Sequence, residues 1–373
     1  MMLLRRRSQL PLRPNRPNKT NAASAKLASD SAALSAASQA VTAASAAVDQ
    51  ARYAQENLLP TFSFTAEQKA LTQQLAREAK AVDDQVIPLG GWLGDSAITG
   101  APAFNEWATK MTDTTLEAYQ AGDYENYLER LKPYYGDWTD QLKSDKNETV
   151  DLTNVTDAQV HELSTFTAAL LNRISQELGI DNIVSKEVAT QGAAAVAKEV
   201  AQISTRDNVF GGHYLRALHT AYYDHGLTNS PADEPRYQTA DSNDMGESLS
   251  TYGDSEISGP KMSMAKVKEN LVQSIAGMIF ADGGSQMGHA ISMLGLDTID
   301  NPNNEQIIGV APSYAGMPNS WNTNVISMHI NQPYLSCFKN PTAEQKQKQD
   351  AAGMFVELPD QTANAAREEL KQA

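Results

Sequence analysis

Three of the six histidines in this 373-residue chain fall in one short stretch. His213, His219 and His225 are spaced six residues apart, which does not place them on one face of a helix. They could share one metal ion only if the chain bent between them, so we expect at most one or two in a functional site. His213 follows Gly211 and Gly212, whose backbone freedom lets the next side chain point into a groove.

Two more residues with useful chemistry also follow glycine. Glu247 comes directly after Gly246, and His289 comes directly after Gly288. Two histidines and a carboxylate suit zinc or another divalent cation, and they suit general acid/base chemistry when no metal is bound. The sequence therefore predicts His213, Glu247 and His289 as a weak metal site or a catalytic set. Isolated histidines are more often surface or capping residues, so the order of the motifs carries the prediction.

The sequence contains no Gly-x-Ser-x-Gly nucleophile elbow, no phosphate-binding glycine loop and no His-Glu-x-x-His helix. Cys337 is the single cysteine, which excludes an internal disulfide framework and a multi-cysteine metal site. It follows the last expected strand with no base beside it in the sequence. We therefore interpret it as a buried or incidental thiol rather than a nucleophile.

The charge pattern argues against nucleic acid as a partner. The chain has 30 basic and 45 acidic residues, a net charge of -15, yet residues 1–19 carry six basic residues and no acidic one. The rest therefore carries 24 basic and 45 acidic residues, a balance of -21, which repels phosphate backbones. No stretch reaches the roughly 18 to 20 apolar residues of a membrane span, and no export signal is visible, so no membrane insertion is expected.

The elements that would position these residues begin with a distinctive N-terminal region. Residues 1–21 are basic and rich in proline and asparagine, and we expect them to be disordered. Residues 22–87 are predicted to form a helical coiled-coil stalk, because large apolar residues in an alanine-rich stretch recur every seventh position. That pattern also fits an intrachain hairpin, a self-associating dimer or a frayed single helix. The heptad positions are Leu27, Leu34, Val41 and Val48.

The stalk prediction has a second helix, opened by a capping box at Thr65 and Gln68. Residues 88–149 are predicted to form a small helical subdomain rich in aromatic residues, most of them packing contacts. At the other end of the chain, residues 336–373 are predicted to be a linker followed by the start of a second helical stalk. We interpret that tail as a sign of a truncated or partial reading frame.

Residues 150–335 have the composition of a compact domain. Thr156 or Asp157 can cap a helix that ends near Gly179. Helices come first and alternating strands come last, which predicts an α+β sandwich. The other expected helices cover about 186–203, 215–223 and 265–280, and the expected strands cover 307–310 and 325–330.

The order of motifs in this domain resembles the PgrA-type surface exclusion domain of Gram-positive bacteria. That domain in turn is similar to the CAP superfamily, which includes the SCP-like bacterial proteins. The runs that carry the resemblance are 150–159 with the helix to Gly179, Gly211-Gly212-His213, Lys266 to Phe280, Gly288-His289-Ala290 with Leu294-Gly295-Leu296, and Ile308-Gly309-Val310.

The resemblance implies a CAP-like α-β-α sandwich whose cleft is flanked by a Gly-Glu-Asn motif and a Gly-His motif. Glu247 and His289 stand in these two motifs, and His213 matches an earlier cleft histidine. Glu269 is the nearest candidate for a second cleft glutamate. Ser248 replaces the usual asparagine. In some members such a His/Glu set binds a divalent metal weakly, which makes zinc the implied cofactor.

Two functions from different classes follow. The first is a cell-surface or cell-wall protein that displays the domain on its stalk and modulates cell-cell contact, aggregation or conjugation. Its partners would be surface components of neighbouring cells or cell-wall polymer. The second is a metal-assisted hydrolase acting on protein or peptidoglycan, with His213, Glu247 and His289 holding zinc. A stalk fragment with an inactive sandwich is a third reading.

Overall fold

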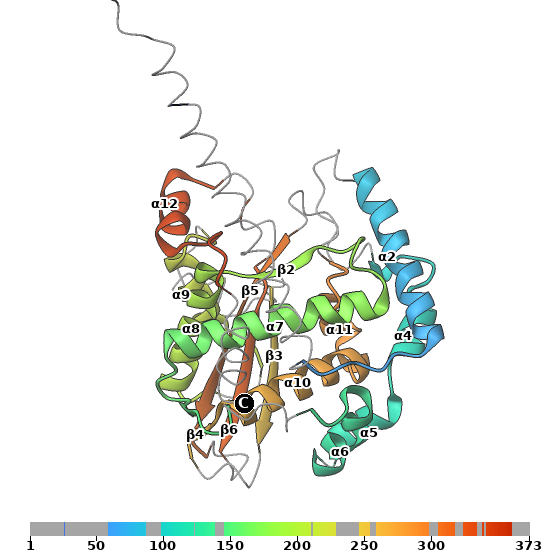
Figure 1. The fold of residues 1–373 in the computed structure, drawn as a ribbon, viewed down its shortest axis with the longest axis horizontal. Helices are drawn as coiled ribbons and strands as arrows, with labels where there is room; N and C mark the ends of the chain where they lie inside the picture. Colours follow the sequence, from blue (N-terminus) through green and yellow to red (C-terminus); the bar gives the residue numbers. More distant parts are fainter. Residues whose placement is uncertain are drawn as a thin grey trace, which may run out of the picture. The chain divides into compact units, whose positions relative to one another are not determined.

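The computed structural model describes most of the chain from Leu59 onward (Figure 1). Apart from Lys26, the described residues belong to one compact unit, Ala54–Ala373. Residues 1–21, the heptad positions and Cys337 lie outside the described residues, so the predictions made for them stay predictions. The described residues are 26, 59–86, 98–122, 124–138, 145–209, 212–228, 246–253, 259–297, 305–317, 324–333, 338 and 341–359.

A four-stranded sheet forms the centre of this unit, in the order β2-β5-β6-β3. β5 pairs parallel with β2 and antiparallel with β6, and β6 pairs antiparallel with β3. β3 is therefore an edge strand. The strands are β2 (Lys186–Ala189), β3 (Glu247–Gly253), β5 (Glu305–Ala315) and β6 (Val325–Asn331).

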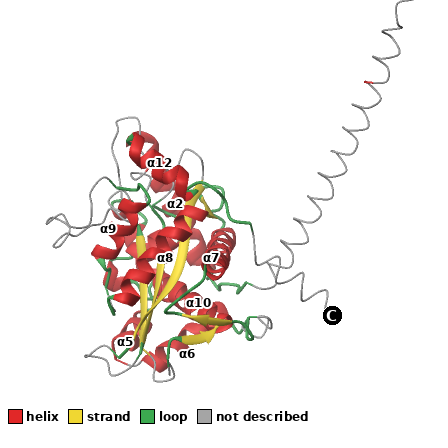
Figure 2. Ribbon diagram, turned by 90° about the vertical axis from the view of Figure 1, so that its left-hand side faces the viewer, coloured by secondary structure: helices red, strands yellow, loops and turns green. Residues whose placement is uncertain are grey.

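Helices pack around this sheet, and every residue of β6 is buried (Figure 2). Ile307 belongs to a hydrophobic cluster with α8 and α9, whereas Ile308 and Val310 belong to the larger cluster with α7, α10 and α11. Successive strand residues point to opposite faces, so the sheet is covered on both. This confirms the α+β class. The helices are α7 (Asp157–Leu178), α8 (Gln191–Arg206), α9 (Leu215–Asp224), α10 (Met264–Phe280) and α11 (Gly288–Met293).

Local sequence signals set the ends of α7. The Thr156 hydroxyl accepts a hydrogen bond from the Gln159 backbone, and the Gln159 side chain accepts one from the Thr156 backbone. Gly179 ends the helix in the left-handed region, with φ of 71°. Thr190 and Ser263 cap α8 and α10 in the same way through their hydroxyls. The predicted start and end of α7 are confirmed.

A second, two-stranded sheet was not predicted. β1 (Thr149–Asp151) pairs antiparallel with β4 (Lys261–Ser263). β1 lies a few residues before α7, and β4 ends directly before α10. The pairing therefore holds the starts of these two helices together. Beside it, the buried ammonium of Lys268 lies 2.6 Å from both Asp145 Oδ2 and Glu162 Oε1.

The N-terminal helices belong to the same core as the main domain. Leu75 and Trp107 are fully buried in the cluster that contains α7 and α10 residues. The Gln73 amide donates to the Leu178 carbonyl at 2.7 Å, and the Phe62 N–H donates to the Glu177 carboxylate at 2.9 Å. The four helices are α2 (Ala66–Val86), α4 (Phe104–Met111), α5 (Thr114–Gly122) and α6 (Tyr124–Tyr135).

The packing of α2 differs from the stalk packing that was predicted for it. The capping box at Thr65 and Gln68 is confirmed, with both reciprocal hydrogen bonds present. The helix was predicted as part of the stalk, and in the structure its apolar face is buried against the domain. Periodicity reveals an apolar stripe without revealing what covers it.

The region after β6 also differs from the expected linker. α12 (Ala343–Ala352) is capped by Thr342 and ends at Gly353 in the left-handed region. The Leu358 N–H donates to the Ala189 carbonyl at 2.9 Å, which ties the chain back to β2. Residues 341–359 therefore belong to the domain. No helix among the described residues is long and apolar enough to cross a membrane.

Candidate functional site

Glu247 connects two of the histidines. Its Oε2 lies 2.7 Å from His213 Nδ1, and its Oε1 lies 2.8 Å from His329 Nδ1. His329 Nε2 lies 2.8 Å from the Ser313 hydroxyl. The result is a continuous chain of hydrogen bonds from His213 through Glu247 and His329 to Ser313, which we call the Glu247 network.

The sheet register assembles the inner part of this network. Leu249 on β3 and Ala311 on β5 lie directly opposite His329 on β6. Glu247 and Ser313 are each two residues from those positions, so their side chains project to the same face as His329 and reach it diagonally. His213 enters from outside the sheet, just before α9.

The carboxylate of Glu247 is enclosed. The Glu247 side chain is 1% exposed and the His329 side chain 2%, while His213 is 41% exposed. Burial raises the pKa of Glu247, but the hydrogen bonds from His213 and His329 outweigh burial and lower that pKa to about 2. The hydrogen bond with Glu247 in turn raises the pKa of His213. An ionised carboxylate only accepts hydrogen bonds, so both imidazole Nδ1 atoms donate.

The connectivity from Ser313 to His329 to Glu247 is that of a serine, histidine and carboxylate triad. Its setting does not suit catalysis, because Ser313 is 1% exposed and does not line the pocket described below. A nucleophile must reach a substrate carbonyl, which a serine within the sheet cannot do in this conformation. We therefore interpret the Glu247 network as a set of hydrogen bonds that stabilises the fold.

His289 makes a separate pair. His289 Nδ1 lies 2.7 Å from Asp282 Oδ1, and the Ala290 N–H donates to Asp282 Oδ2 at 3.0 Å. Gln286 and Met287, in the turn before α11, both have left-handed backbone angles, with φ of 54° and 65°. Such angles cost energy outside glycine, so the surrounding contacts hold this turn in place.

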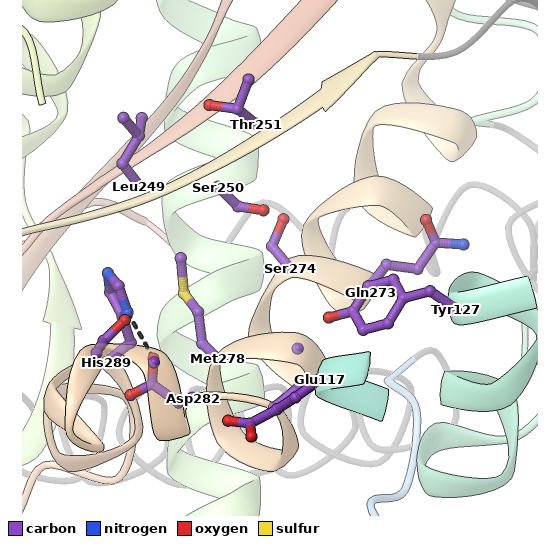
Figure 3. Close-up of a pocket in the computed structure, with 14 residues that line it drawn as sticks. Glu117, Tyr127, Leu249, Ser250, Thr251, Gln273, Ser274, Met278, Asp282 and His289 are labelled. Carbon is purple, nitrogen blue, oxygen red and sulfur yellow. Dashed lines mark hydrogen bonds and ion pairs between the residues drawn. The ribbon is translucent and has the colours of Figure 1, made fainter. Parts of the chain in front are cut away.

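The pair lines a pocket of about 440 Å³ between α10, β3 and the turn before α11 (Figure 3). Ser250 points from β3 toward Ser274 of α10, and Glu117 enters from α5. The pocket lining combines polar and apolar groups. They include Glu117, Tyr127, Ser250, Gln273, Ser274, Met278, Asp282 and His289.

The pocket contains ionisable groups with unusual surroundings. Burial raises the pKa of the Tyr127 hydroxyl, and the nearby charge of Asp282 raises it further. The Asp282 side chain is 4% exposed, while that of His289 is 27% exposed. Asp282 therefore orients an imidazole that can still reach the pocket, which makes His289 the accessible base of this region.

The other predicted site residues lie elsewhere. Glu269 pairs with Lys266 on α10 at 2.9 Å and does not line the pocket. His225 Nε2 lies 3.1 Å from Glu199, and His219 is buried within α9. The three clustered histidines thus make different contacts. His329, Ser313 and Asp282 were not among the predicted site residues; a histidine within a buried strand was the one signal for His329.

The predicted metal ligands do not converge on one point. Both carboxylate oxygens of Glu247 accept hydrogen bonds from His213 and His329, and the Nδ1 atom of His289 faces Asp282. Across the described parts of the chain, no three histidine, cysteine, aspartate or glutamate side chains form a group that could hold a metal ion. In this arrangement the residues do not fit a shared zinc ion.

Comparisons with known proteins add one likeness. No protein-family model matches the chain, and no curated protein matches it. The chain is similar to a solved structure described as the CAP domain of Enterococcal PrgA, at 17% sequence identity and a TM-score of 0.40. The match covers 68% of this chain and 93% of that one. At this level of similarity no residue role or partner transfers from that structure.

Proposed function

We propose that this chain is a cell-surface protein of the surface-exclusion type, which displays a CAP-like domain to modulate contact, aggregation or conjugation between cells. The sequence order that resembles the PgrA-type domain supports the location and the role. Within the domain, the pocket beside α10 and β3 is the surface that would contact a component of a neighbouring cell or a cell-wall polymer.

The observation that supports a binding role is the difference in solvent accessibility between the Glu247 network and the pocket. The Glu247 carboxylate is enclosed and holds two imidazoles, while the pocket is open and lined by several polar side chains. Buried groups in a complete hydrogen-bond network stabilise a structure, and open polar pockets recognise ligands. The domain therefore has a rigid frame beside a recognition surface.

The test is an assay on living cells. Recipient Gram-positive cells displaying the full chain are compared with cells displaying Ser250→Tyr, which fills the pocket. We expect plasmid transfer into wild-type recipients, or their aggregation, to change relative to undecorated cells, and Ser250→Tyr to abolish that change. Ser63→Tyr is the matched control, because Ser63 is exposed and does not line the pocket. The proposal would be wrong if plasmid transfer and aggregation were the same for cells that display the chain and cells that do not.

One observation favours a hydrolase as the second candidate. The Asp282 and His289 pair has the orientation of a carboxylate-supported general base at a pocket wall. A hydrolysis screen on casein and peptidoglycan, with His289→Ala as the control, tests it. Turnover that disappears in His289→Ala would establish this activity.

A zinc titration tests the metal-assisted form of that candidate. The full chain is titrated calorimetrically beside a double variant of confirmed fold, His213→Ala with His289→Ala. Stoichiometric binding that is lost in the double variant would show that both histidines reach one ion after rearrangement. Equal heats in the two proteins would remove the metal-assisted form and leave the binding role.

A further inference from the structure

The outer edge of β3 lies beside the pocket. The Gln332 N–H donates to the Gly246 carbonyl at 2.7 Å, so these two residues form a hydrogen-bonded antiparallel pair. In antiparallel ladders such pairs alternate with pairs whose backbone groups point outward. Ser248 and Ser250 therefore direct their backbone groups to β6, and Leu249 and Thr251 direct theirs away from it.

These outward groups have no backbone partner among the described residues. Within the described ranges β3 pairs with β6 alone, and no backbone hydrogen bond there reaches the N–H or carbonyl of Leu249 or Thr251. Both residues line the pocket, yet their side chains point to the far side of the strand (Figure 3). They therefore line it with their main chain. An edge with unpaired groups is a template for an added strand.

An added strand would direct one side chain into the pocket. Side chains opposite one another in a sheet project to the same face. Ser250 points into the pocket, so the residue facing it on an added strand would point there too. Neighbouring residues of that strand would point to the other face, toward the side of Leu249 and Thr251.

The pocket chemistry selects the kind of side chain. Within the described part of the chain, the Glu117 carboxylate has no hydrogen-bond or ion-pair partner, and its Oε1 atom is shielded from solvent. Gln273 is 4% exposed, and its Oε1 atom also lacks a described partner. Asp282 adds a second carboxylate. Unsatisfied acceptors and negative charge together favour a cationic donor-rich side chain.

We propose that the edge of β3 and the adjoining pocket bind an extended peptide of another protein, with arginine or lysine at the position that faces Ser250. This inference rests on the proposed function, because it names the ligand class of the same pocket. The basic segment 1–19 of this chain is a poor occupant. It has proline at positions 11, 14 and 17, which removes N–H donors that a ladder needs.

Fluorescence anisotropy with the full chain tests the strand pairing. The probe is a fluorescein-labelled heptapeptide with alternating threonine and valine and a central arginine. Copies carry one N-methylated amide at each position in turn. Because only alternate amides of an added strand face β3, we expect losses of about tenfold or more at every second position and about twofold or less between them. Uniform losses, or no binding of any probe, would overturn the proposal.

The same assay tests the side chain in the pocket. Replacing the central arginine by glutamate should abolish binding, and Glu117→Gln should weaken the arginine probe about tenfold while leaving an alanine probe unchanged. Glu129→Gln is the matched control, because Glu129 is exposed and does not line the pocket. Equal effects of the two variants would overturn the basic specificity.

The peptide assay and the cell assay can fail separately. If Ser250→Tyr abolishes the cellular effect but no peptide binds, the strand addition is wrong and the proposed function stands. If the peptides bind in alternating register but displaying cells behave like undecorated ones, the ligand class stands and the surface-exclusion role fails.

Discussion

Polar groups on the two faces of the sheet at β3 have opposite environments. On one face of the sheet, the Glu247 carboxylate accepts hydrogen bonds from His329 and from His213, which lies outside the sheet, so both of its oxygens are satisfied. On the opposite face, the Ser250 side chain points into the pocket, where Glu117 and Gln273 each have an acceptor atom without a hydrogen-bond partner among the described residues. The difference teaches that a glutamate and histidine motif in sequence can belong to the frame, while the ligand surface comes from residues with no motif.

The largest effect should come from breaking the Glu247 network. Glu247→Ala removes the shared acceptor of His213 and His329 and leaves the His329 Nδ1–H without a partner in a side chain 2% exposed. Leaving a buried hydrogen-bond donor without its partner costs about 1 to 3 kcal/mol. Urea unfolding followed by circular dichroism measures the loss. A loss below about 1 kcal/mol would show that this network does not stabilise the fold.

A second buried carboxylate sharpens the comparison. Glu187 on β2 is also enclosed, but burial and the nearby Asp297 raise its pKa well above the usual range, although Gln332 donates a hydrogen bond to it. Because the folded-state pKa is raised above the ordinary value of 4.5, this group costs stability as the pH rises beyond that value. We expect Glu187→Gln to raise the free energy of unfolding at pH 7 by on the order of 1 kcal/mol.

The control for Glu187→Gln is the same measurement near pH 4. There the glutamate is protonated in the folded state at no added cost, so the gain should shrink. A variant that destabilises equally at both pH values would show that the carboxyl is ionised and needed.

The pH dependence of unfolding separates the contribution of His213 from that of Glu247. The pKa of His213 is raised in the folded state, so its contribution is complete below pH 6.5 and is lost as pH rises through the folded pKa. The pKa of Glu247 is lowered to about 2, so its contribution is complete above pH 4.5 and is lost as pH falls toward 2. The network therefore stabilises most between about pH 4.5 and 6.5.

The alkaline loss should be small, under about 1 kcal/mol, because solvent screens the exposed part of His213. Thermal denaturation across pH 5 to 9 measures it. His213→Ala should flatten the alkaline limb and leave the acid limb in place. An unchanged alkaline limb in that variant would assign the titration to another group.

The smallest effect on stability should come from the pocket. His289→Ala removes a partly exposed side chain whose partner Asp282 keeps its hydrogen bond from Ala290. We expect a cost of about 1 kcal/mol, because the imidazole is partly exposed and water in the pocket can replace its hydrogen bond to the buried Asp282 carboxylate. Urea unfolding beside Glu247→Ala provides the comparison. A cost equal to that of Glu247→Ala would mean that His289 in the pocket stabilises the fold as much as the Glu247 network does.

Local chemistry in the sequence determined several elements by itself. The capping residue Thr156 and the left-handed Gly179 set the ends of α7, and the box at Thr65 opened α2, because these signals act over three or four residues. The pairing of Glu247 with His213 also follows the predicted set. The heptad segment and its stalk were predicted from periodicity and lie outside the described residues.

The tertiary structure alone decided which residues meet. His329 and Ser313 reach Glu247 because the register of β3, β6 and β5 aligns positions more than 60 residues apart in sequence. The same folding turned the outer edge of β3 toward the pocket, whereas Asp282 and His289 meet within the local turn before α11. Spacing along a chain reports only local periodicity, whereas strand register is set by packing across the whole domain.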